Sequence, residues 1–158
     1  MRSKRILLRD ESKLQLINPE TLSILQKYKV DMSMRNLSEK TQQHYIYDLE
    51  RWFIYILDTQ QNRSIKELTD EDIMEFLYFC KSEGNNAERI KGILATISAM
   101  YRYLRKKRQI QENPCEFIDR PKKGAAITQQ TYLTPEQVAL MRERLICSDN
   151  LQLRVYAM

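Results

Sequence analysis

Apolar residues recur every three to four positions through most of the chain, which is the repeat of helices packed on a core. The longest run, 86–108, carries a stripe made of Ile90, Ile93, Leu94, Ile97, Met100, Tyr101 and Leu104. A second stripe, in 38–58, is made of Tyr45, Leu49, Trp52, Phe53 and Ile56. No long alternation of apolar and polar residues, as a half-buried strand would need, is present. The pattern predicts an all-α fold.

Capping residues place the helix starts. Asn18-Pro19 predicts a helix that ends near Arg35-Asn36, and Ser38 predicts the start of the next helix. Thr69 predicts a third helix over 69–83, whose acidic first turn suits the helix dipole. Residues 115–118 predict a short helical turn, and 149–158 predict the start of a last helix. Thr134-Pro135-Glu136-Gln137 reads as a capping box, so a helix is expected there too.

The outer face of the 86–108 helix is small in its middle and cationic at its edges. Gly92, Ala95 and Ala99 form the middle, and the flanking cations are Lys91, Arg102 and Lys106. Small side chains let a polyanion come close, and the cations neutralise phosphates. The alternative is a solvated helix that happens to carry alanines, and this helix alone does not decide between them.

The 38–58 helix has a polar stripe opposite its apolar one. Its members are Lys40, Gln43, His44, Tyr47 and Arg51, and Thr41 stands beside them in the first turn. The stripe is nearly free of acids, and these side chains suit base edges and phosphates. An ordinary surface face is the alternative.

The composition narrows the function class. The 158-residue chain has a formal net charge of +5 and a pI of about 9.1, which favours a nucleic acid or another acidic partner. Cys80, Cys115 and Cys147 are odd in number and widely spaced, and His44 is the single histidine, so a metal site is not expected. Cys80 is expected in the core of a reduced, intracellular protein. No run has the length of a signal peptide or a membrane span, so no membrane partner is expected.

The distribution of proline, glycine and charged residues along the chain predicts four parts. Residues 1–17 read as a partly ordered arm, 18–119 as a helical domain, 120–131 as a basic linker rich in Pro, Lys and Gly, and 132–158 as the start of a second domain. The chain stops inside an amphipathic segment, which suggests a truncated protein.

Three groups of residues together resemble the N-terminal half of a tyrosine recombinase (phage integrase, Xer-like). In 38–58 the similar residues are Ser38, Thr41, Tyr45, Asp48, Leu49 and Phe53. In 86–108 they are Leu94, Ile97, Tyr101, Arg102, Tyr103 and Leu104. Asn113-Pro114, Pro121-Lys122 and Tyr132-Leu133-Thr134-Pro135-Glu136 are similar to the run that leads into the family's catalytic domain. The resemblance covers roughly 18–158.

The resemblance implies that 18–119 is a four-helix, SAM-like core-binding domain, one jaw of a clamp around double-stranded DNA. It implies that helices 38–58 and 86–108 lie against the major groove and that the linker follows the DNA to the catalytic jaw. The DNA-binding residues expected from the two faces and the linker are Lys40, Thr41, Gln43, His44, Tyr47, Arg51, Lys91, Arg102, Lys106, Lys122 and Lys123. Two departures weaken this expectation, because Gly92 and Ser98 stand where the family often has a basic residue.

For the full-length protein the resemblance implies DNA integration, excision or dimer resolution through a 3′-phosphotyrosine intermediate, with no metal or nucleotide cofactor. The catalytic arginine is expected shortly beyond Met158, so none of the catalytic residues is expected here and the chain alone should be inactive. A tetramer on DNA is implied for the full-length protein and a monomer for this chain. A cytoplasmic, nucleoid-associated protein encoded by a bacterium or a phage is implied as well.

Two other functions remain open. A stand-alone helical DNA-binding regulator would need a compact helix-turn-helix, and these helices are long for one. A helical protein-interaction module would leave the basic linker and the small, cationic helix face unexplained.

Overall fold

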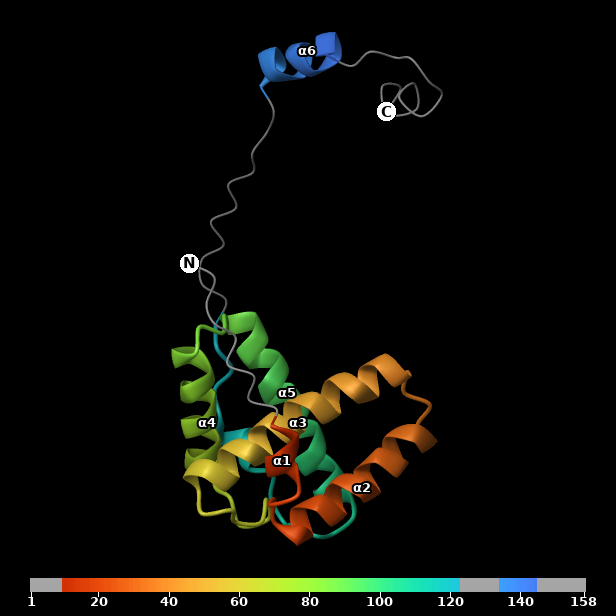
Figure 1. Cartoon of the computed structure of the whole chain (residues 1–158), viewed down its shortest axis with the longest axis vertical. Coiled ribbons are helices and arrows are strands. Elements are labelled where there is room, and N and C mark those ends of the chain that lie inside the picture. The colour runs from red at the N-terminus through yellow and green to blue at the C-terminus, as the bar shows by residue number, and fades with distance from the viewer. Residues whose placement is uncertain (1–9, 123–133, 145–158) are drawn as a thin grey trace. The chain divides into compact units, whose positions relative to one another are not determined.

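The computed structural model describes residues 10–122 and 134–144, and over these residues it consists of helices and their connections (Figure 1). The chain divides into two compact units, 1–124 and 125–158. The first contains α1 (Glu11–Leu14), α2 (Pro19–Met34), α3 (Glu39–Thr59), α4 (Asp70–Ser82), α5 (Ala87–Lys106) and the 3₁₀ turn η1 (Pro114–Phe117). The second contains α6 (Pro135–Arg144). The described residues include no strand, so the all-α prediction is confirmed.

The predicted caps begin their helices, and a further cap, Asn86, begins α5. The side chain of Asn18 accepts a hydrogen bond from the Glu20 amide (2.9 Å), and that of Asn86 accepts one from the Arg89 amide (2.9 Å). Thr69 forms a capping box at the start of α4. In the second unit, Thr134 Oγ1 accepts from the Gln137 amide (3.3 Å) while Gln137 Oε1 accepts from the Thr134 amide (3.1 Å). Each cap satisfies backbone donors that a helix start leaves without partners.

Asn36 and Gly84 stand where the chain leaves α2 and α4. Asn36 has φ 55° and Gly84 has φ 90°, in the left-handed region where the chain turns away from a helix. Asparagine and glycine enter that region at little cost, so each helix ends close to where the sequence predicts.

Both predicted apolar stripes face the core of the first unit. All seven stripe residues of α5 are buried, as are Leu49, Trp52, Phe53 and Ile56 of α3, whereas Tyr45 is half-buried at its edge. The Trp52 ring lies 5.5 Å from that of Phe53 and 5.8 Å, edge-on, from that of Tyr101 of α5. Cys80 is buried as predicted, and burial raises the pKa of its thiol to about 11. Cys147 lies outside the described residues.

Residues 10–17, which belong to the predicted N-terminal arm, pack against the rest of the first unit. Ile17 is 3% exposed and belongs to the core, and Lys13 Nζ lies 2.7 Å from Asp58 Oδ2 at the end of α3. Asn62 fixes the segment further: its Oδ1 accepts from the Asn18 amide (2.8 Å), and its Nδ2 donates to the Leu16 carbonyl (2.9 Å). Residues 10–17 therefore pack against α3 and the 60–69 connector.

Candidate nucleic-acid interface

The polar stripe of α3 lies mostly on the surface. Lys40, Gln43 and His44 are exposed, and Tyr47 is 36% exposed. Arg51 is half-buried. Its guanidinium carbon stands 5.7 Å from the Tyr47 ring centroid, and its Nε is buried with no hydrogen-bond partner among the described residues. Stacking on Tyr47 holds this cation against the helix surface.

Thr41, predicted to bind DNA, is also part of the cap of α3. Its Oγ1 lies 2.8 Å from Ser38 Oγ, and its amide donates to the same oxygen at 3.2 Å. The side chain is half-buried. A DNA contact by this hydroxyl would therefore compete with the cap or share it.

The small face of α5 is open. Ala95 is exposed, and Gly92 and Ala99 are partly exposed. A Cβ added to Gly92 would meet no atom within 4 Å, so no close neighbour in the described structure requires glycine there. Glycine inside a helix costs about 0.5–1 kcal/mol relative to alanine. No contact among the described residues compensates for this cost.

The cations at the C-terminal end of α5 fall into two groups. Arg105 pairs with Glu116 of η1 (Nη1 to Oε1, 2.6 Å), and Lys107 Nζ lies 5.9 Å from the Tyr103 ring centroid. Arg102 and Lys106 are exposed and have no acidic partner within the described part of the chain. Lys91, at the other end of the face, pairs loosely with Glu88 (3.4 Å). The two unpaired cations are therefore available to an external anion.

An ion pair joins α3 to the start of α5. The Asp48 carboxylate of α3 is fully buried, and both of its oxygens accept from Arg89 in the first turn of α5: Nη1 donates to Oδ2 at 3.1 Å, and Nη2 donates to Oδ1. His44 Nε2 stands 3.6 Å from Oδ2. Asp48 thus connects the polar stripe of α3 to the start of α5.

The sequence prediction missed Arg89. One signal was present: a cation in the first turn of a helix opposes the helix dipole, so it needs an anionic partner from elsewhere. Asp48, an acid at the margin of the apolar stripe of α3, was the available partner. The pair became visible only with the fold, because the two residues are 41 positions apart.

The remaining candidates lie elsewhere. Ser98, at a departure from the family pattern, has its Oγ 3.3 Å from Asn113 Nδ2, the cap residue of η1. Lys122 is exposed and borders a hollow of about 450 Å³ that also touches Met74 and Tyr78 of α4. Lys123 lies outside the described residues. The structure therefore leaves the α3 and α5 candidates on two helices that the Asp48–Arg89 pair joins, and it places Lys122 beside α4.

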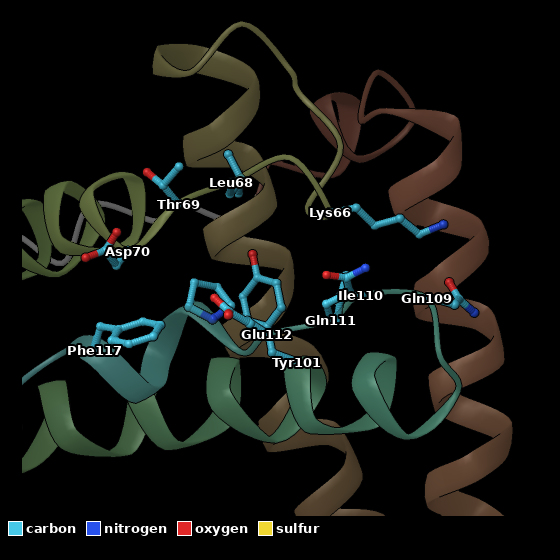
Figure 2. A pocket seen from close by; sticks show the side chains of 11 residues that line it. Lys66, Leu68, Thr69, Asp70, Tyr101, Gln109, Ile110, Gln111, Glu112 and Phe117 are labelled. Carbon is cyan, nitrogen blue, oxygen red and sulfur yellow. The ribbon is translucent and has the colours of Figure 1, made fainter.

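A second hollow, of about 420 Å³, lies between the connector and the segment that follows α5 (Figure 2). Figure 2 shows Tyr101 rising from α5 towards the connector, where its hydroxyl donates to the Ile65 carbonyl at 2.8 Å. The ionisable residues that line this hollow are Lys66, Asp70, Glu112 and Tyr101, and they form no nucleophile-and-base pair. Residues 10–122 and 134–144 hold no cluster of metal-ligating side chains and no helix long and apolar enough to span a membrane.

Comparison with known proteins gives a consistent result. Residues 24–111 match the family model described as phage integrase, N-terminal SAM-like domain. A putative tyrosine recombinase of Caldanaerobacter subterraneus subsp. tengcongensis is 34% identical over 110 residues, which cover 68% of this chain and 36% of that protein. The tyrosine recombinase XerD of Halalkalibacterium halodurans is 26% identical over 145 residues, covering 92% of this chain and 47% of that protein. The XerD of Oceanobacillus iheyensis is 28% identical over 89 residues, covering 56% and 30%. The chain thus spans less than half the length of these relatives, and no solved structure matches it.

Proposed function

The chain belongs to the phage integrase family of tyrosine recombinases, and from this we propose that its residues 18–119 form a domain that grips double-stranded DNA at a recombination site. The DNA would meet the polar stripe of α3 (Lys40, Thr41, Gln43, His44, Tyr47 and Arg51) and the small, cationic face of α5 (Lys91, Gly92, Ala95, Ala99, Arg102 and Lys106). Lys122 and Lys123 would follow the backbone beyond the domain.

One observation carries the proposal: the open glycine on α5 with unpaired cations on the same face. Gly92 costs helix stability and meets nothing within 4 Å, which suits a surface that another backbone approaches closely. Arg102 and Lys106 are exposed on that face and suit phosphate oxygens. A purely solvated face would gain nothing from the glycine.

For the whole protein we propose site-specific strand cleavage and rejoining through a 3′-phosphotyrosine, in integration, excision or dimer resolution. This chain covers 30–47% of the length of these relatives. The residues for that chemistry would lie in the part of the protein that it does not cover. The same proposal includes a catalytic domain that starts at 132, a tetramer assembled on DNA, a monomeric state for this chain alone, and a place in the cytoplasm with the nucleoid.

Replacing Lys91, Arg102 and Lys106 together by glutamine is expected to weaken binding to duplex DNA and to flatten its salt dependence. Each phosphate contact contributes about 0.9 to the slope of log K against log salt, so the slope should fall by up to about 2.7. Fluorescence anisotropy of a labelled mixed-sequence duplex, titrated at several salt concentrations, measures both quantities.

The matched control replaces Lys27, Lys29 and Lys66 by glutamine, which removes the same charge from α2 and the connector. Its slope should stay close to that of the wild type. Equal slopes for both triple variants would remove the α5 cations from the interface, and a wild-type protein that binds no duplex at all would contradict the proposed function.

Replacing Gly92 by alanine is expected to raise the free energy of unfolding by about 0.5–1 kcal/mol and to weaken DNA binding. Gly92→Leu should weaken binding further, since a larger side chain fills the space that the DNA backbone would need. Urea unfolding and anisotropy report the two effects. Ser23→Ala, on the exposed side of α2, is the control that should leave DNA affinity unchanged. Stabilised Gly92 variants that bind DNA as tightly as the wild type would show that no backbone approaches this position.

A further inference from the structure

The ion pair between α3 and α5 is an unusual choice for the place it occupies. Asp48 is completely withdrawn from solvent, and Arg89 is 27% exposed. Removing a carboxylate from water costs several kcal/mol, and packed apolar residues at such a position often stabilise a fold equally well. What a two-pronged guanidinium–carboxylate contact adds is a fixed relative geometry. The pair therefore constrains the crossing more specifically than apolar packing would.

The charged and ionisable groups around Asp48 come from three helices. His44 stands on α3 itself, Arg89 on α5, and Cys80, whose thiol is close enough to be influenced by the Asp48 charge, on α4. One of these neighbours, His44, belongs to the polar stripe. The buried carboxylate thus lies next to one residue of the face that would meet DNA.

We propose that Asp48 is a positioning residue for DNA binding. By holding Arg89, it fixes the first turn of α5 against α3, so that the polar stripe and the small, cationic face meet the same stretch of duplex. This inference rests on the proposed function, and it assigns Asp48 no contact with DNA.

Simple electrostatics makes the opposite prediction, which gives the test its power. Asp48 is an anion close to a surface that would bind a polyanion. If its only effect on DNA were its charge, removing that charge would leave binding unchanged or tighten it. If Asp48 positions the two helices, its removal weakens binding although the protein becomes more positive.

The experiment compares Asp48→Asn with Glu39→Gln. Both substitutions remove one negative charge from α3, but Glu39 is exposed in the first turn and Asp48 is buried. Duplex affinity is measured by anisotropy at several salt concentrations, after circular dichroism has established that each variant is folded at the assay temperature. We expect Asp48→Asn to bind at least about tenfold more weakly. A single phosphate interaction is worth roughly fivefold in affinity at near-physiological salt, and a displaced α5 face would lose more than one of them. Glu39→Gln should bind as well as the wild type or better.

A second readout separates positioning from general weakening of the fold. Asp48→Asn is combined with the Lys91, Arg102 and Lys106 to glutamine variant. If Asp48 acts by placing the α5 face, the combined decrease in binding free energy is smaller than the sum of the separate decreases, because both changes act on the same phosphate interactions. Should Asp48→Asn fail to fold, Arg89→Lys replaces it; lysine keeps the charge but lacks the planar fork, and the same weakening is expected.

The outcomes are distinct. A folded Asp48→Asn that binds as tightly as Glu39→Gln, or decreases that add fully in the combined variant, would overturn the positioning role and leave the proposed function standing. A wild-type protein that binds no DNA would overturn the proposed function itself.

Discussion

Replacing Trp52 by alanine is expected to lower the free energy of unfolding of the first unit by about 3–5 kcal/mol. Trp52 is fully buried and joins α3 to α5 through its contact with Tyr101, so its removal leaves a cavity where the two helices pack. It is also the chain's single tryptophan. Urea unfolding should therefore be followed by far-ultraviolet circular dichroism, which does not depend on the indole signal.

Trp52→Phe is the matched variant. Phenylalanine keeps a ring between Phe53 and Tyr101 and removes the indole Nε1, which is buried and finds no hydrogen-bond partner within residues 10–122 and 134–144. An unsatisfied buried donor costs roughly 1–3 kcal/mol, and its removal offsets part of the decrease in packing energy. The decrease in stability should be less than half of that in Trp52→Ala. Equal decreases in the two variants would mean that the ring contacts contribute little.

Replacing Arg89 by methionine is expected to cost about 3–5 kcal/mol, because it leaves the Asp48 carboxylate buried without its ionic partner. His44 is 3.6 Å away and its side chain is 56% exposed, so it is poorly placed to take over. The same urea titration measures the decrease in stability.

Two controls show whether burial is the cause. Arg105→Met breaks the exposed pair with Glu116, whose side chains are 47% and 50% exposed, and should cost no more than about 1 kcal/mol. Asp48→Leu combined with Arg89→Met replaces the buried pair by apolar side chains and should recover most of the stability. A cost for Arg89→Met as small as that for Arg105→Met would contradict the burial of Asp48.

The sequence predicted what local chemistry decides. Asn18, Ser38 and Thr69 cap helices because their side chains reach backbone amides two or three residues ahead, within one turn. The apolar stripes of α3 and α5 are likewise set by a spacing that is visible in the chain itself. These features required no knowledge of which helix packs on which.

The sequence did not reveal what depends on distant residues. The burial of Asp48 follows from Arg89, 41 positions away, and the packing of Ile17 depends on a core built by later helices. Arg51 was expected on an open face, yet stacking on Tyr47 and burial of its Nε hold it half inside. The DNA-binding residues remain predictions, and Lys123 and the helix expected over 149–158 lie outside the described residues.

The reciprocal bonds of Asn62 also bear on the order in which the chain becomes structured during its synthesis. Asn18 and Asn62 are 44 positions apart, and the Asn18 side chain returns a bond to the Asn62 carbonyl at 3.1 Å. Ribosomes add roughly 5–20 residues per second. The segment from Leu16 to Asn18 is therefore synthesised several seconds before Asn62. Its hydrogen bonds to Asn62 can form only after α2 and α3 have left the ribosome.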